Sequence, residues 1–136
     1  MRYLLDTNVF SELVKLRPNV ALFRRFVDNS PRLVTASMVL YEMLDGLHRM
    51  PASKKRKVVA KHIEGIRRSI PILSYDERAA DWHAYHRRKL EKQGISTSIV
   101  DGQIAAIAAT NGCVLVTHNL RHFESFEGLQ VETWMG

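Results

Sequence analysis

The sequence predicts an α/β protein in three layers, with a short, mostly parallel central sheet and helices on both of its faces. Short apolar runs alternate with helical patterns along the chain, and this order is typical of parallel sheets. The length of 136 residues suits a single domain over residues 1–136. No apolar run approaches the roughly 18 residues that a membrane span needs, and no signal peptide is evident. We therefore expect no membrane attachment.

The first apolar run, residues 3–5, ends abruptly at Asp6, which Thr7 and Asn8 follow. In open α/β sheets, ligands bind outside the carboxyl ends of the strands. A carboxylate at that point is well placed to bind a metal ion. Asp6 or Thr7 equally suits the cap of a helix that begins near Val9. This stretch alone leaves both interpretations open.

Helical patterns flank a second expected strand at residues 33–36. Asn19 can cap the helix before this strand, and Ser37 can cap the helix after it. One face of the first helix consists of Val20, Phe23 and Val27. The core face of the second consists of Leu40, Met43, Leu44 and Leu47.

A single carboxylate, Glu42, lies within the apolar run of residues 38–44. Burying an unpaired charge is costly. Glu42 therefore either faces solvent beside Asp45 and Arg49, or faces a cleft where it binds a ligand. We favour the cleft, because perturbed acids gather at functional sites.

The formal net charge of +6 indicates an anionic partner, and nucleic acid is the commonest. Much of the excess lies on a basic amphipathic helix expected over residues 53–69 and on the helix that follows it. A solvated helix face is the alternative explanation for any single cation. The cations that we expect to meet RNA phosphates are Lys54, Lys57, Lys61, Arg87 and Arg88.

A short edge strand is expected at residues 70–73, because Pro71 cannot donate to a sheet. A long helix then opens at Asp76 and Glu77 and ends near Gly94. Its Trp82 and Tyr85 are interpreted as core or interface aromatics. The predicted inner stripe of this helix is Ala79, Trp82, Tyr85, His86 and Leu90.

The helix that begins at residues 96–101 is apolar on nearly all sides, so it should be central and buried. Ser98 and Asp101 have the spacing of a capping box, with Asp in place of Glu. A metal role for Asp101 is compatible with this cap, and both remain open. The next strand, residues 114–116, ends at polar residues 117–119. The single cysteine, Cys113, is expected in the core of a reduced, cytoplasmic protein.

Four oxygen-bearing residues are thus expected at one edge of the sheet: Asp6, Glu42, Asp101 and Asn119. Hard cations such as Mg²⁺ take oxygen ligands, and a pair of them can clamp a phosphodiester during its hydrolysis. Carboxylates gathered without a metal would raise one another's pKa. The chain has no zinc-type Cys/His spacing, Gly-rich phosphate loop or Gly-x-Ser-x-Gly elbow.

Four motifs, in this order, resemble the PIN domain and, more narrowly, the VapC-type toxins of bacterial toxin–antitoxin systems. They are Leu-Leu-Asp-Thr-Asn at residues 4–8, Glu42, Asp-Gly-Gln-Ile-Ala-Ala at residues 101–106 and Val-Thr-His-Asn at residues 116–119. The resemblance spans the whole chain. It implies a PIN-like fold, a Mg²⁺- or Mn²⁺-dependent endoribonuclease, a neutralising VapB-like antitoxin and, usually, a homodimer.

The resemblance also implies roles for individual residues. Asp6, Glu42 and Asp101 match the acids that bind the metal and catalyse, and Asn119 stands at the fourth position. Relatives often carry an acid there, and here Asn119 and His122 occupy the corresponding places. This difference bears on a second metal ion more than on the first.

Neighbouring polar residues receive lesser roles. Thr7, Asn8 and Thr117 are expected to orient ligands or waters. His118 and His122 are expected to be exposed loop histidines, and neither is assigned as a general base.

Two other functions compete with the ribonuclease toxin. One is a catalytically weak or inactive protein that acts with its antitoxin as a DNA-bound repressor complex, and a weaker one is a general metal-dependent phosphatase. Under the toxin hypothesis, surplus apolar side chains form a groove for a partner helix. That partner should cross the acidic pocket with an Arg or Lys. The surplus residues are Phe10, Leu13, Leu44 and Leu47.

Overall fold

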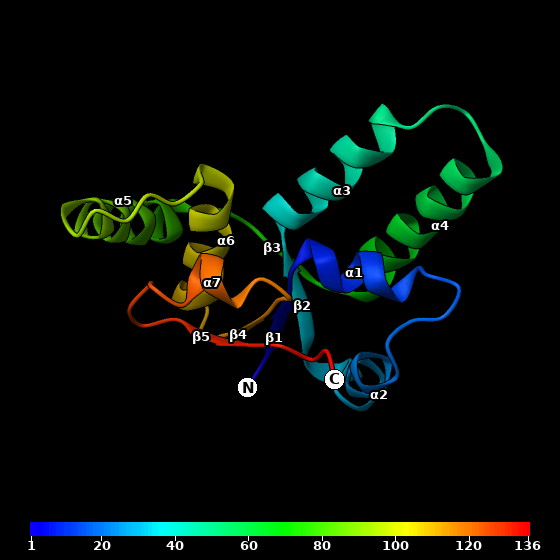
Figure 1. Ribbon diagram of the computed structural model, residues 1–136, viewed down its shortest axis with the longest axis horizontal. Coiled ribbons are helices and arrows are strands. Elements are labelled where there is room, and N and C mark those ends of the chain that lie inside the picture. The colour runs from blue at the N-terminus through cyan, green and yellow to red at the C-terminus, as the bar shows by residue number, and fades with distance from the viewer.

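The computed structural model describes residues 1–136 and centres on a five-stranded sheet with strand order β3-β2-β1-β4-β5 (Figure 1). The strands are β1 (Tyr3–Leu5), β2 (Leu33–Ala36), β3 (Ile72–Leu73), β4 (Val114–Val116) and β5 (Gln130–Glu132). Every neighbouring pair is parallel. The predicted parallel sheet is therefore confirmed, with the strand after Pro71 at one edge and the last strand at the other.

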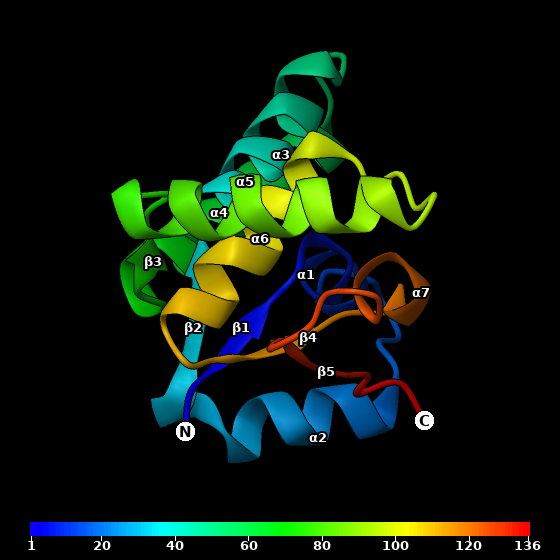
Figure 2. The ribbon, with the colours of Figure 1, turned by 90° about the vertical axis from the view of Figure 1, so that its left-hand side faces the viewer.

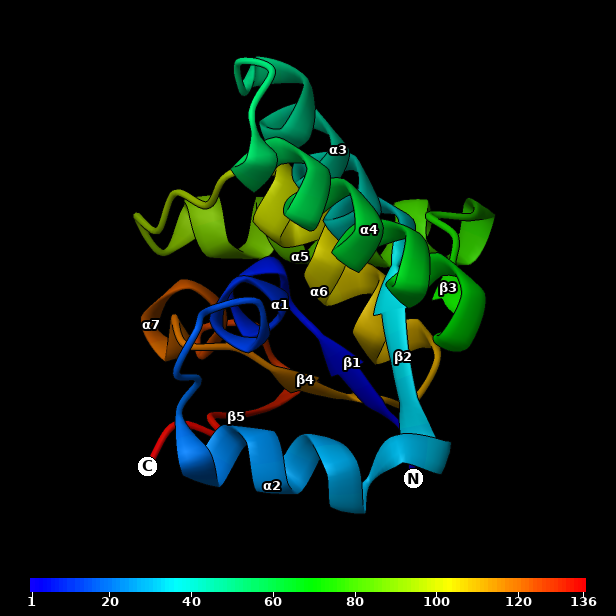
Figure 3. The same ribbon diagram turned by 90° about the vertical axis from the view of Figure 1, so that its right-hand side faces the viewer.

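Helices cover both faces of this sheet. They are α1 (Thr7–Leu13), α2 (Val20–Asp28), α3 (Ser37–Arg49), α4 (Lys54–Ser69), α5 (Glu77–Lys92), α6 (Ile99–Thr110) and α7 (Leu120–Phe123). Figure 2 shows α5 and α6 on one side of the strands and α2 crossing the other side. The α3–α4 hairpin projects away from the sheet as an arm (Figures 1 and 3). The three-layer architecture is confirmed.

The core lies between the central strands and α6. Leu4 and Leu5 on β1 and Leu115 on β4 are fully buried, and so is the run from Ile104 to Ala108 on α6. Each large apolar side chain buried in this way stabilises the fold by about 1.5–3 kcal/mol. The prediction of a central, buried α6 is confirmed. No helix combines the length and the hydropathy needed to cross a bilayer.

Side-chain caps begin several helices where the sequence indicates them. Asn19 accepts a hydrogen bond from the Leu22 N–H at the start of α2, at 3.0 Å. Asp76 does the same for the Ala79 N–H at the start of α5, also at 3.0 Å. The prediction that Ser37 caps α3 is wrong, because β2 runs directly into the helix. Buried Ala36 then holds the cap position, and Ser37 is already the first helical residue.

The predicted inner stripe of α5 is wrong at one position. Tyr85 is 63% exposed, whereas His83 is buried with 6% exposure. The stripe that faces the core runs through Ala79, His83 and Leu90. An apolar pattern does not include histidine, so the sequence gives no sign that His83 is buried. In the structure the Tyr75 hydroxyl is hydrogen-bonded to His83 Nδ1 at 2.9 Å and satisfies one of the two ring nitrogens.

Candidate active site

The acids converge at the carboxyl edge of the sheet, where β1 and β4 end side by side. Leu5 pairs with Val116, so the residues that follow, Asp6 and Thr117, are neighbours. The Asp6 N–H donates to the Val116 carbonyl at 3.0 Å and continues the ladder by one step. Parallel pairing therefore brings together two residues that lie 111 positions apart in the sequence.

Asp6 is 5% exposed, and both of its carboxylate oxygens are engaged. Oδ1 accepts the Thr7 N–H at 2.8 Å, and Oδ2 accepts the Thr117 hydroxyl at 2.8 Å. Burial raises the pKa of Asp6, the two hydrogen bonds oppose the rise, and the Asp101 charge adds to it. Asp6 thus caps α1 and also lies close enough to Asp101 for their charges to interact.

Thr117 is the fully buried centre of the hydrogen-bond network. Its hydroxyl donates to Asp6, and its oxygen accepts from Asn8 Nδ2 at 3.3 Å and from the Asn119 N–H at 3.1 Å. Asn8 Oδ1 in turn accepts the His118 N–H at 3.1 Å. These bonds tie the loop after β4 to the start of α1 and set the direction of the Asp6 carboxylate.

Glu42 lies in the second turn of α3 and is partly buried. The Thr7 hydroxyl donates to its Oε1 at 2.7 Å. Burial raises the pKa of Glu42, the Thr7 bond opposes this, and the charges of Asp6 and Asp101 raise it further. The alternative in which Glu42 faces solvent beside Asp45 and Arg49 is therefore wrong.

Asp101 lies in the first turn of α6, and its N–H donates to Ser98 Oγ at 3.1 Å. Half of the predicted capping box is present. The Asp101 carboxylate does not complete the box, and its Oδ2 instead lies 3.4 Å from Nδ1 of His122. The side chain remains 26% exposed at the edge that carries Asp6 and Glu42. Capping by Ser98 therefore leaves the Asp101 carboxylate available to a ligand.

The fourth position differs from the expectation in its geometry. Asn119 is exposed, and its backbone N–H, rather than its side chain, joins the network through Thr117. His122 reaches Asp101 because α7 begins directly after Asn119 and turns back over the edge. Sequence reasoning missed this contact, although one helical turn after a strand end brings a side chain to the same edge. His118, expected to be exposed, is partly buried, and burial lowers its pKa.

The expected RNA-contacting cations fall into two groups. Lys54, Lys57 and Lys61 are exposed on α4, on the projecting arm, and pair with no carboxylate. Arg87 and Arg88 on α5 both bind Glu91, at 3.1 Å and 2.6 Å. Glu91 offsets part of the charge on α5, so of these two groups only the lysines of α4 have no carboxylate partner.

The donor set fits a hard divalent cation. No three acidic, histidine or cysteine side chains are grouped so as to enclose an ion by themselves. Mg²⁺ commonly takes one or two carboxylates and keeps several waters, so a complete protein cage is not required. The Asp101 charge raises the pKa of both Asp6 and Glu42, so a cation at this edge would relieve a repulsion already present.

The fold and the cluster of acids at the carboxyl edge of the sheet define a nuclease of the PIN class. The sequence pattern described as the PIN domain matches residues 3–129. A tRNA(fMet)-specific endonuclease VapC from Salmonella typhimurium is 31% identical over 134 residues, which cover 98% of each chain. Ribonuclease VapC2 from Haemophilus influenzae is 30% identical over 135 residues, which cover 99% of each chain.

Solved structures agree. A DNA-bound VapBC from Salmonella typhimurium aligns with a TM-score of 0.87 at 30% identity and covers 98% of both chains. FitAcB from Neisseria gonorrhoeae aligns with a TM-score of 0.86 at 26% identity and covers 95% of both chains. The chain belongs to the PIN domain family and, within it, to the VapC ribonucleases.

We predict that Asp101→Asn melts at or above the wild-type temperature in EDTA at pH 8. The raised pKa values of Asp6 and Glu42 mean that metal-free stability falls as pH rises from their unfolded values through their folded values. Removing the Asp101 charge relieves part of that loss, and its advantage should shrink on acidification. The exposed His122 pairing that is lost contributes little. Thermal melts from pH 4 to pH 8 measure the effect.

Millimolar Mg²⁺ should then raise the melting temperature of the wild type more than that of Asp101→Asn, because a ligand of the folded state stabilises it by mass action. If Asp101 serves only to stabilise the N-terminus of α6, the variant loses about 0.3–1 kcal/mol of its free energy of unfolding, because its charge no longer interacts with the helix dipole. In that case Mg²⁺ shifts both melts equally, and the assignment of Asp101 to a metal site is wrong.

Proposed function

We propose that this protein is a Mg²⁺- or Mn²⁺-dependent endoribonuclease toxin that acts in the cytoplasm and is neutralised by a cognate antitoxin. One observation carries the proposal: at the carboxyl edge of the sheet the Asp101 charge raises the pKa of both Asp6 and Glu42, and the Asp6 charge raises the pKa of Glu42 as well. Such an arrangement costs stability without a cation and suits phosphodiester chemistry with one. Residues 1–136 act as one domain.

The chain's own residues divide the work of the site. Asp6 and Asp101 hold the ion, and Glu42 is a further ligand or positions the attacking water. Thr117 and Thr7 hold the Asp6 and Glu42 carboxylates in place through hydrogen bonds of 2.8 Å and 2.7 Å. When bound there, the ion would supply activation of water and stabilisation of the negative charge that develops on the phosphate oxygens. Asn8 and Asn119 support the network through Thr117.

RNA is proposed to approach along the arm. Lys54, Lys57 and Lys61 lie three and four positions apart on α4, so they share a helix face. Arg87 and Arg88 form a separate group of cations on α5, which lies on the opposite side of the molecule from α4 (Figure 1), and Glu91 binds both. Contacts between such cations and phosphates are independent of sequence and weaken with salt. These lysines are therefore expected to hold the RNA backbone without selecting among base sequences.

Glu42→Gln should lower the rate of RNA cleavage by at least about 100-fold, the size of effect seen when a group that stabilises the transition state is lost. Gln keeps an oxygen that can accept the Thr7 hydroxyl, so the local structure should survive. Cleavage of structured RNAs by purified protein with Mn²⁺, and with EDTA as the metal-free control, measures the loss. Glu77→Gln, at an exposed glutamate near the start of α5, is the matched control and should cleave as the wild type does.

The same assay separates the enzyme from the non-catalytic alternative. Metal-dependent cleavage that Glu42→Gln abolishes supports the ribonuclease. Tight RNA or DNA binding by the wild type without cleavage under any metal would instead indicate a binding protein that works as part of a repressor complex.

An antitoxin is proposed to occupy a groove of about 440 Å³ between α2 and α4. Phe23 and Leu13 line the groove, and Phe23 is 50% exposed. Val20 and Val27 lie on the same exposed face of α2, at 70% and 53% exposure. Such an apolar face suits an amphipathic partner helix, and an Arg of the partner that extends beyond the groove would suit the carboxylates of the acids.

The predicted groove residues need correction. Phe10 is 1% exposed and belongs to the core, so it cannot contact a partner. Leu13 lines the groove, whereas Leu44 and Leu47 are partly buried on α3 and pack against the core. The exposed apolar side chains lie instead on α2. The helical pattern predicts that they share one face of α2, but it does not show that this face is exposed.

Phe23→Asp should prevent capture of the antitoxin from extracts of the native host, because a charge in an apolar groove is costly to desolvate. Val58→Asp on α4 is the control, since Val58 has a similar exposure of 56% and does not line the groove. The captured small protein, identified by mass spectrometry, should suppress RNA cleavage when it is added back. Equal capture by both variants would place the antitoxin elsewhere.

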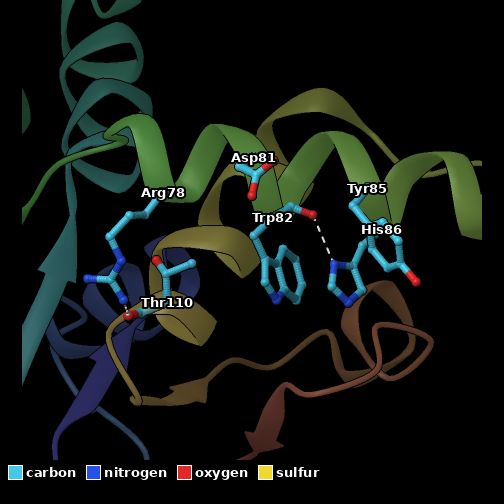
Figure 4. Close-up of a pocket in the computed structure, with 6 residues that line it drawn as sticks. All are labelled: Arg78, Asp81, Trp82, Tyr85, His86 and Thr110. Carbon is cyan, nitrogen blue, oxygen red and sulfur yellow. Dashed lines mark hydrogen bonds between the residues drawn. The ribbon is translucent and has the colours of Figure 1, made fainter.

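A homodimer is proposed through the exposed face of α5. Figure 4 shows the hollow that this face forms with the end of α6, with Tyr85, Trp82 and Asp81 on α5 around it. The Trp82 ring stacks on His86 with 3.8 Å between ring centres, so the two rings form one aromatic surface. A twofold axis near Tyr85 would bring the acidic Asp81 of one copy toward the cations of the other.

Tyr85→Asp should convert the dimer to a monomer, because it removes the most exposed aromatic ring on α5 and places a charge at the axis. Sedimentation velocity at micromolar concentration, beside the wild type and Val58→Asp, measures the change. A wild type that sediments as a monomer excludes the dimer, and a dimeric Tyr85→Asp excludes this face.

A further inference from the structure

Behind Asp101, on the side away from the other acids, α5 packs against the first turn of α6. The contact consists of His83 on α5 and Gly102 on α6, both buried. Neither residue belongs to the acid cluster. The family motif at residues 101–106 includes Gly102 but does not explain why a histidine is buried at position 83. The His83 ring meets Gly102 one residue away from Asp101, which is a proposed metal ligand.

The His83 ring is held from one side only. Its Nδ1 is hydrogen-bonded to the Tyr75 hydroxyl at 2.9 Å, and the two rings meet edge to face with 5.9 Å between their centres. Its Nε2 is buried and has no hydrogen-bond partner. An unsatisfied N–H is costlier than a bare lone pair facing a C–H group, so this geometry favours Nδ1–H donating to Tyr75 and an unprotonated Nε2 facing Gly102.

Gly102 leaves the space that the ring occupies. A Cβ at this position would lie 2.1 Å from His83 Nε2 and 2.6 Å from Cδ2, distances at which one group has to move. Gly102 has ordinary helical geometry, and it is not among the glycines with positive φ. Glycine lowers helix propensity, so its presence near the start of the central helix is explained by the ring and not by the backbone.

We propose that His83 is a positioning residue for Asp101, acting through its contact with Gly102. The Tyr75-anchored ring is a rigid stop against which the first turn of α6 rests. The stop sets how closely that turn approaches α5 and therefore where the Asp101 carboxylate lies relative to Asp6 and Glu42. This inference rests on the proposed metal role of Asp101.

Gly102→Ala in the full chain tests the contact. The added methyl group meets the ring, displaces the first turn of α6 and should weaken Mn²⁺ binding by about 10- to 100-fold, as happens when groups that orient metal ligands are altered. Binding is measured from the electron paramagnetic resonance signal of free Mn²⁺, and folding from the circular dichroism melt in EDTA. Gly46→Ala is the matched control. It lies on α3 one turn from Glu42, has nothing within 4 Å of its added Cβ, and should bind Mn²⁺ as the wild type does.

Rescue distinguishes positioning from a general loss of stability. His83→Ala alone removes the stop and should also weaken Mn²⁺ binding. In the double variant Gly102→Ala/His83→Ala the new methyl group fills part of the space that the ring leaves. The double variant should therefore recover most of the lost Mn²⁺ affinity and return the displaced Asp101 amide NMR signal toward its wild-type position. Wild-type affinity in Gly102→Ala, or a double variant that binds no better than Gly102→Ala, overturns the proposal. If Gly102→Ala does not fold, a double variant that folds and binds Mn²⁺ supports the proposal, and one that does not fold overturns it.

Asp101→Asn, measured in parallel, separates this proposal from the proposed function. If Asp101→Asn binds Mn²⁺ as tightly as the wild type does, the metal role of Asp101 is wrong. The contact is then judged by the Asp101 amide signal alone, which must move in Gly102→Ala and return in the double variant. An amide signal that does not move overturns the contact as well.

Discussion

The hydrogen bond from Thr117 to Asp6 holds the edge of the sheet together where the chemistry is proposed to occur. It joins the residue after β1 to the residue after β4, and it exists because these two strands are parallel neighbours in register. The same hydroxyl oxygen accepts bonds from Asn8 and Asn119. A buried threonine that makes three hydrogen bonds has no freedom to rotate, so the Asp6 carboxylate inherits the rigidity of the sheet.

The positions of the other two acids depend on this hydrogen bond to different degrees. Glu42 is linked to it through Thr7, whose hydroxyl bonds the glutamate while its N–H bonds Asp6. Asp101 has no hydrogen bond to the network, and its position follows from how α6 packs and is capped. The three carboxylates are thus positioned by a sheet, a hydroxyl bridge and a helix start, and they repel one another across the gap. Folding gathers like charges here because the apolar core beneath the edge stabilises the structure by far more than the repulsion costs.

Much of this arrangement could be predicted from the sequence, because its signals are local. Leu4 and Leu5 ending at Asp6, the all-apolar α6 and the cap at Ser98 are short-range patterns that specify a strand, a buried helix and its first residue. The errors arose where the outcome depends on partners distant in the sequence. The apolar pattern predicts Tyr85 on the inner stripe and gives no position for His83, because the hydrogen bond with Tyr75 that accompanies the burial of His83 is not visible in that pattern. The sequence places Phe10 in a partner groove, because nothing local shows how α1 packs. The approach of His122 to Asp101 depends on the turn that α7 makes over the sheet.

The projecting α3–α4 arm connects the proposed RNA-binding lysines with one of the proposed catalytic acids. Glu42 lies in the second turn of α3, near the end of the arm that joins the sheet. The unpaired lysines begin at the first residue of α4, at the opposite end of the arm (Figure 1). Helix α4, with 16 residues, is about 24 Å long. RNA bound along this length would contact the same helical hairpin that carries Glu42. The proposed substrate surface and one of the proposed catalytic acids therefore belong to one continuous element of the fold.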